Sequence, residues 1–221
     1  MRSLCAAATA LIVLAGAASA ARATPTGLNN IPTAEVVDEG VLVLQGFSEF
    51  GRERAPGWFA GFKYGPAANW EMGLDDTVAG PGSAGGPTLQ GKYRMPCHDA
   101  AALALGLANI SDDRSRHGNV FSYAVVSGDL GPVNGHLGYS WQADNRAWFL
   151  GIDGAVSPEL TLRADWTQAQ DGDESVAGLG FIRSLSPRWL IEGWASLPTA
   201  EEAETSYIVK LDWVIPLPGR R

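Results

Sequence analysis

Apolar and polar residues alternate along most of the chain with a period of two, which is typical of β-strands that bury one face. Within 160–168, for example, positions 160, 162, 164 and 166 are Leu, Leu, Ala and Trp, whereas 161, 163, 165 and 167 are Thr, Arg, Asp and Thr. Similar alternation recurs near 70–75, 88–95, 133–142 and 206–215. Helical periodicity is scarce, so the pattern predicts an all-β fold.

Turn residues divide the chain after position 40 into twelve such segments. Each segment has about 9–11 residues, the length that a tilted strand needs to cross a bilayer. The sequence therefore predicts an antiparallel up-and-down transmembrane β-barrel of about 12 strands, within a range of roughly 10 to 14. The expected strands lie near 41–51, 57–65, 69–77, 86–96, 100–110, 119–129, 133–142, 147–156, 160–168, 175–185, 189–197 and 205–215.

The connections between these segments alternate in character. Those after the even-numbered segments are short, and the five internal ones each contain proline: Gly65-Pro66, Pro96-Cys97, Gly131-Pro132, Ser157-Pro158 and Ser186-Pro187. Those after the odd-numbered segments are longer or more charged, such as the stretch from Asp112 to His117. Outer-membrane barrels have short periplasmic turns and longer extracellular loops, and this alternation matches them.

The positions of tryptophan and of charged residues indicate which face of the sheet contacts lipid and which faces the lumen. Six tryptophans lie at or near strand ends, as in the aromatic girdles of membrane barrels: Trp58, Trp70, Trp141, Trp148, Trp189 and Trp213. The polar faces carry both signs of charge and predict a charged lumen, whose lining candidates are Glu71, Asp75, Lys92, Arg94, His136, Asp153, Arg163, Asp165, Lys210 and Asp212. The alternative is a secreted soluble barrel or sandwich whose tryptophans face a dry core.

The ends of the chain predict four regions. Residues 1–20 have the charge, the apolar stretch and the Ala18-Ser19-Ala20 site of a signal peptide. Residues 21–40 form an N-terminal segment that we expect either to enter the lumen as a plug or to cap the periplasmic rim. Residues 41–217 form the barrel, and 218–221 form a C-terminal tail. After cleavage a single cysteine, Cys97, remains, so no intramolecular disulfide is expected.

The segment Thr26-Gly27-Leu28-Asn29-Asn30-Ile31-Pro32-Thr33-Ala34, followed by Gly40, resembles the mature N-terminus of many bacterial outer-membrane barrel proteins. The resemblance implies a barrel in the outer membrane, in contact with its lipid and with the barrel assembly machinery, and it implies no particular activity. Such proteins often end on an aromatic residue of the last strand. This chain departs from that pattern, because it continues through Pro216-Leu217-Pro218 to Arg221.

Residues that carry chemistry are sparse, and no cofactor, metal site or enzymatic activity is expected. His136 and Ser140 share a strand face but are too far apart for contact, and we recognise no serine, histidine and acid that form a catalytic set. Cys97-His98 lacks the ligand spacing of a zinc site. The acidic stretches 171–174 and 201–204 lack that of a calcium loop, so we expect solvated loops.

Three functions remain open from the sequence. The first is a small outer-membrane pore or substrate channel, and the second is a structural or anchoring barrel that binds another envelope component. The third is a soluble binding barrel. The formal net charge of −8 disfavours nucleic acid as a partner, and no solute or protein partner can be named.

The hairpin around Pro158 allows a sharper prediction about the lumen. A turn at Ser157-Pro158-Glu159 sets Asp153 opposite Arg163. We expect Asp153 and Asp165 to hold and neutralise Arg163, which would make the lumen less attractive to anions.

Overall fold

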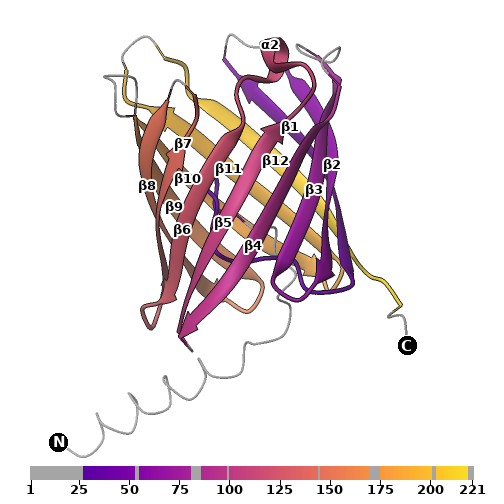
Figure 1. Cartoon of the computed structure of the whole chain (residues 1–221), viewed down its shortest axis with the longest axis vertical. Coiled ribbons are helices and arrows are strands. Elements are labelled where there is room, and N and C mark those ends of the chain that lie inside the picture. The colour runs from indigo at the N-terminus through magenta and orange to yellow at the C-terminus, as the bar shows by residue number, and fades with distance from the viewer. Residues whose placement is uncertain are drawn as a thin grey trace, which may run out of the picture.

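A computed structural model describes residues 27–52, 55–80, 86–98, 100–143, 145–169, 175–200 and 203–218. The predicted signal peptide, the 171–174 stretch, Glu201-Glu202 and the last three residues lie outside the described residues. The described chain forms a closed barrel in which each strand pairs antiparallel with the next and β12 returns to β1 (Figure 1).

Twelve strands build the wall of the barrel. They are β1 (Val41–Gly51), β2 (Gly57–Ala67), β3 (Trp70–Ala79), β4 (Thr88–His98), β5 (Ala101–Ile110), β6 (Phe121–Asp129), β7 (Asn134–Trp141), β8 (Arg146–Ser157), β9 (Leu160–Ala169), β10 (Val176–Ser186), β11 (Trp189–Pro198) and β12 (Ser206–Pro216). One short helix, α2 (Arg114–His117), lies in the loop between β5 and β6. Among the described residues, no helix is both long and apolar enough to cross a membrane.

The predicted fold class is confirmed, and each predicted segment overlaps one observed strand. The largest differences are shifts of the strand ends, such as 86–96 against Thr88–His98. The register of the β8–β9 hairpin is also confirmed, because Asp153 pairs with Arg163 and Leu150 with Trp166. Strong alternation and proline-containing turns made these elements readable from the sequence.

The connections define two rims of the barrel. The turns between β2 and β3, β8 and β9, and β10 and β11 each span only two residues and lie at the short-turn rim. The opposite rim carries α2 and the longer connections, and it is at the top of Figure 1. We call it the long-loop rim.

The outer face of the wall is apolar. In β12, Tyr207, Val209, Leu211 and Trp213 are exposed, whereas the alternate residues Ile208, Lys210, Asp212 and Val214 are buried. The six tryptophans at strand ends are all exposed, and several aromatic rings pair across strands, as Trp189 and Trp213 do with ring centroids 5.5 Å apart. A band of exposed apolar side chains thus surrounds the barrel.

Residues 27–38, which we call the inner segment, lie inside the barrel rather than on its wall. Leu28, Ile31 and Ala34 are buried in a cluster with side chains from β5, β6 and β8, which include Tyr123 and Phe149. Val37 is buried in a second cluster with residues of β1, β10, β11 and β12. Gly40 then leads directly into β1, and its N–H donates to the Gly65 carbonyl at 2.8 Å.

Candidate functional site

The inner segment bends into a tight turn whose tip is Asn29 and Asn30. The Leu28 N–H donates to the Ile31 carbonyl at 2.9 Å, and Gly27 forms an antiparallel bridge with Pro32. Asn29 is buried and Asn30 is exposed within the barrel. The turn therefore presents two adjacent asparagines to the wall.

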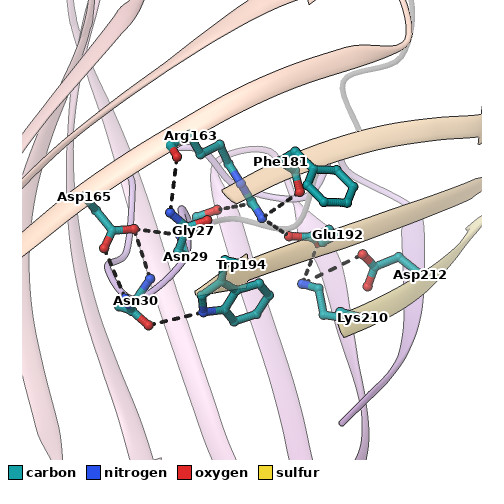
Figure 2. Close-up of polar contacts among 10 residues, drawn as sticks. All are labelled: Gly27, Asn29, Asn30, Arg163, Asp165, Phe181, Glu192, Trp194, Lys210 and Asp212. Atoms are coloured by element: carbon teal, nitrogen blue, oxygen red, sulfur yellow. Dashed lines mark hydrogen bonds and ion pairs between the residues drawn. The ribbon is translucent and has the colours of Figure 1, made fainter. Parts of the chain in front are cut away.

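Asp165 on β9 is the main acceptor for this tip (Figure 2). Its Oδ2 accepts the backbone N–H of Asn29 at 2.9 Å and that of Asn30 at 3.1 Å, while its Oδ1 accepts the Asn30 side-chain amide at 3.3 Å. On β11, Trp194 Nε1 and Ser196 Oγ donate to Asn30 Oδ1 at 3.3 and 2.8 Å. Asn30 is thereby bound through both ends of its side-chain amide.

The rest of the inner segment is held mainly through its backbone. The Ala34 N–H donates to Ser127 Oγ at 2.7 Å, and the Val37 N–H donates to Glu71 Oε2 at 2.9 Å. Lys92 Nζ donates to the Thr33 carbonyl at 3.0 Å. Because peptide groups must be satisfied when buried, side chains of β3, β4 and β6 supply the partners that a sheet would otherwise provide.

A buried ionic network lies on the opposite part of the inner wall, formed by β9, β11 and β12 (Figure 2). Glu192 Oε2 is 2.6 Å from Arg163 Nη2, and Glu192 Oε1 is 2.7 Å from Lys210 Nζ. Lys210 Nζ is also 3.8 Å from Asp212 Oδ2. The Glu192 carboxylate is therefore shared by two buried cations, and Asp212 is a second carboxylate beside Lys210.

Arg163 corrects one prediction. Although Asp153 and Arg163 are register partners, the Arg163 guanidinium binds Glu192 and also donates to the Gly27 and Phe181 carbonyls. It reaches past Gly180, its register partner on β10, to Glu192 on β11. The prediction that Asp153 and Asp165 hold Arg163 is wrong, since Asp165 accepts the inner segment and Asp153 binds elsewhere.

Asp153 belongs to a second polar row, which joins β6, β7 and β8. Its Oδ1 lies 2.7 Å from His136 Nε2, and its Oδ2 accepts the Asn134 side-chain amide at 3.0 Å. His136 Nδ1 lies 2.7 Å from Ser127 Oγ. Serine, histidine and carboxylate are therefore in one row, which sequence reasoning missed because it compared His136 with Ser140.

This row holds the inner segment. Ser127 is buried, and its Oγ accepts the Ala34 N–H, so the hydroxyl is occupied on both sides. Ser140 lies apart, with its Oγ donating to the Ala147 carbonyl at 3.4 Å. The row borders a cavity of about 310 Å³ beside the inner segment, whose polar lining includes Glu35, Arg94, Asp129, Asn134, His136 and Asp153.

A third polar group lines the wall between β1 and β4. Gln45 Nε2 donates to Asp75 Oδ1, and Gln90 Nε2 donates to Asp75 Oδ2 at 3.0 Å. Gly61 lies between Gln45 and Asp75 in the register and leaves room for the Asp75 carboxylate. Asp75 is thus held by two amides, one from β1 and one from β4.

The ten sequence candidates differ in burial and in partners. Seven are buried: Glu71, Lys92, His136, Arg163, Asp165, Lys210 and Asp212. Three are half-buried: Asp75, Arg94 and Asp153. The structure brings Arg163, Lys210 and Asp212 together, and it separates them from the His136–Asp153 row.

Sequence reasoning missed several residues that organise the interior. They are Asn29, Asn30, Gln45, Ser127, Glu192, Trp194 and Ser196. Glu192 and Trp194 could have been predicted, because the alternation that begins at Leu190 places both on the inner face. The role of Asn29 and Asn30 could not be predicted, because the sequence around them does not indicate which residues of the wall they contact.

Metal-binding candidates are few in the part of the chain that the structure describes. It contains no group of three His, Cys, Asp or Glu residues able to hold a metal ion. Cys97 is exposed, and its Sγ lies 3.5 Å from the Met95 carbonyl. The 171–174 stretch lies outside the described residues.

Comparisons with known proteins relate the chain to porins through its fold. No family model matches the sequence, and no curated protein matches it. Among solved structures, the chain is similar to the KdgM porin with a TM-score of 0.59 and 10% identity, over 77% of this chain and 98% of that chain. It is similar to the KdgM porin in complex with disordered oligogalacturonate with a TM-score of 0.60 and 9% identity, over 78% and 98%. The shared feature is the porin-like barrel fold.

Proposed function

We propose that this protein is an outer-membrane channel for small solutes and that the inner segment is its plug. The observation that carries the proposal is a closed barrel with an apolar outer face and a charged, hydrogen-bonded inner face. A closed barrel leaves no backbone group unpaired in hydrocarbon. A soluble barrel would have to expose its apolar band to water, which disfavours that alternative.

The membrane location is supported by the outer face and by the two rims. Aromatic side chains lie near strand ends, where headgroups would contact them. The signal peptide predicted at 1–20 supports export, and the fold is that of porins. We infer that the short-turn rim faces the periplasm and that the long-loop rim faces outward.

The solute preference differs from what one structural neighbour binds. That neighbour, the KdgM porin, was solved in complex with oligogalacturonate, a polyanion. In this chain, Arg163 and Lys210 are paired with Glu192, while the Asp165 carboxylate meets N–H groups of the inner segment. We therefore propose a preference for uncharged or cationic solutes. Asp153→Asn should then shift the reversal potential of the open channel toward anions.

The second candidate is a structural barrel that transports nothing and whose lumen stays closed. The contacts of the inner segment favour it, because wall side chains hold both its tip and the backbone of Ala34 and Val37. In that function the loops would bind another envelope component. The two candidates differ in whether the inner segment moves.

A reversible crosslink tests the proposal. Asn30 and Ser196 point their side chains at each other, with Oδ1 and Oγ 2.8 Å apart. In a Cys97→Ser background, Asn30→Cys and Ser196→Cys should therefore be joined by a short bis-methanethiosulfonate, whose mixed disulfides are reversed by reduction. In planar bilayers we expect the crosslinked protein to stay closed and the reduced protein to show openings. Asn30→Cys alone, with Cys97→Ser, is the control for thiol modification.

Two results would count against the channel. Equal open conductance in the crosslinked and reduced states would show that the inner segment does not gate. Silence in both states, and also after the tip is displaced by Asn30→Asp, would favour the structural barrel.

The membrane location has its own test. Leu162 and Leu211 are exposed on the outer face, so Leu162→Arg or Leu211→Arg should cost about 2–4 kcal/mol of membrane-folding free energy near the midplane. Glu159→Gln, on an exposed turn, serves as a charge-changing control. The measurement is the heat-dependent gel mobility of the folded protein in SDS. A wild-type protein that is monodisperse without detergent would contradict this location.

A further inference from the structure

The tip of the inner segment occupies a surface that is built like a binding site. We propose that Asp165, Trp194 and Ser196 bind an uncharged solute that carries amide groups, such as a short peptide, and that Asn29-Asn30 fills this site as an internal ligand. The inference rests on the proposed channel function and names the solute class for its lumen.

The wall offers an acceptor for the N–H group of a carboxamide and donors for its oxygen. Asp165 accepts the Asn30 side-chain N–H, while Trp194 Nε1 donates to Asn30 Oδ1 (Figure 2). Ser196 Oγ also donates to Asn30 Oδ1. Asp165 also accepts two consecutive backbone N–H groups, from Asn29 and Asn30. A peptide with a polar side chain offers this same set of donors and acceptors.

Two glycines on the wall, Gly178 and Gly180, allow polar groups of the tip to approach the backbone closely. A Cβ atom at Gly178 would lie 2.7 Å from Asn30 Nδ2 and would overlap the Asp165 carboxylate. A Cβ atom at Gly180 would overlap Asn29 Oδ1. Both glycines are on β10, between the strands that carry Asp165 and Trp194. Their lack of side chains gives the tip its room.

The charge of Asp165 favours solutes with N–H groups over polyanions. Among the described residues, every hydrogen bond donated to Asp165 comes from Asn29 or Asn30, and the neighbouring Arg163 binds Glu192. When the tip leaves, the site therefore presents a carboxylate that lacks donors. Such a site accepts N–H groups and repels a polyanion.

The tip can be reached by a competing solute. Asn30 is exposed inside the barrel, and its partner Ser196 is two residues from the long-loop end of β11. A solute that enters from the long-loop rim thus meets the tip first. A solute that replaces the tip would restore the hydrogen bonds of Asp165, Trp194 and Ser196.

The test measures binding by calorimetry on the full mature chain in detergent, with acetyl-Asn-Asn-amide as the probe. Asn30→Asp sets a carboxylate against Asp165 and should displace the tip. We expect it to bind the probe at least about tenfold more tightly than the wild type. Asn145→Asp, on an exposed loop, carries the same change of charge and should bind like the wild type.

Adding Asp165→Asn to Asn30→Asp should weaken binding by about tenfold or more, since a carboxylate acceptor is lost. Asp112→Asn, an exposed acid, is the matched control and should have no effect. Maltotriose and trigalacturonate serve as an uncharged polyol and a polyanion. We expect both to bind Asn30→Asp more weakly than the peptide does.

The outcomes are separable. Absence of peptide binding by an Asn30→Asp variant with wild-type circular dichroism and heat-dependent gel mobility would overturn the inference, as would stronger binding of either saccharide. Calorimetry does not depend on conductance. A channel that conducts but binds no peptide defeats only this inference, whereas peptide binding by a protein that never conducts defeats the proposed function.

Discussion

The two halves of the inner wall hold the same segment by different physical means. On β5, β6 and β8, the buried wall residues are small or aromatic and pack against Leu28, Ile31 and Ala34. On β9 and β11, Asp165, Trp194 and Ser196 bind Asn29 and Asn30 through hydrogen bonds. The first half acts through burial, which has no preferred direction, and the second through donors and acceptors at fixed positions.

The apolar half therefore mainly stabilises the inner segment, and the polar half mainly fixes the position of its tip. Burial of a Leu or Ile side chain is worth about 1.5–3 kcal/mol and tolerates small displacements. Hydrogen bonds in a confined site contribute less free energy, but they fix the tip at one place on the wall. We therefore expect changes in the apolar half to alter stability more than geometry, and changes near Asp165 to alter geometry more than stability.

The largest effect is expected at the ionic network behind the polar half. Glu192→Gln leaves Arg163 and Lys210 buried without their shared carboxylate and should lower the free energy of unfolding by about 3–5 kcal/mol. Urea titration of the folded barrel, followed by tryptophan fluorescence, measures this loss. Glu159→Gln is the exposed control, and a loss of under about 1 kcal/mol in Glu192→Gln would contradict the assignment.

In the apolar half, Phe149→Ala should cost about 3 kcal/mol, because a fully buried ring is replaced by a cavity. The ring lies over Gly138, where a Cβ atom would overlap it, so the site cannot collapse easily. The same urea titration applies. Phe181→Ala, on a partly exposed ring, should cost clearly less, and equal losses would show that Phe149 is not a core contact.

A pair of glycine substitutions compares the two halves directly. Gly178→Ala forces a methyl group between Asp165 and Asn30, whereas Gly151→Ala meets the flexible ends of Leu28 and Ile31. Overpacking of this kind costs about 1–3 kcal/mol where neighbours cannot move. Amide hydrogen exchange should accelerate about tenfold at Asn29 and Asn30 in Gly178→Ala, and less in Gly151→Ala. The reverse order would contradict the division between the halves.

The smallest effect is expected at a hydrogen bond to the inner segment from β6, within the apolar half. Ser127→Ala removes the acceptor of the Ala34 N–H and the neighbour of His136 Nδ1, and it should cost about 1–2 kcal/mol. Exchange at the Ala34 amide should rise while that at Asn29 stays unchanged. Ser115→Ala, on the exposed helix α2, is the control. Uniform acceleration along the segment would mean that it is released as one unit.

The wall could be predicted from the sequence because it depends on local information. Alternation fixes the face of each residue, and the short turn at Ser157-Pro158-Glu159 fixes the β8–β9 register. Partners across more than one strand could not be predicted. Arg163 reaches Glu192 over the intervening strand, and hairpin geometry does not specify such a contact.

The interior contacts of the inner segment were the least predictable part. Entry into the lumen was one of two expectations, and its partners are remote in sequence: Asn29 meets Asp165, and Ala34 meets Ser127. No periodic pattern encodes such contacts, because the inner segment has no regular secondary structure of its own. The polar row of Ser127, His136 and Asp153 was missed for another reason. Ser127 and His136 are register partners in the β6–β7 hairpin, but sequence reasoning compared His136 with Ser140.

The closure of the barrel between its first and last strands has a consequence for folding. Val41 pairs with Pro216 and Gly51 with Ser206, so the seam joins opposite ends of the described chain. Such a closure carries a large loop entropy and makes folding slow relative to local hairpin formation. Until β12 arrives, β1 and β11 are open edges that can pair with other chains. Chains truncated before residue 206 should therefore aggregate, and the rate of seam closure should limit the yield of refolded barrel.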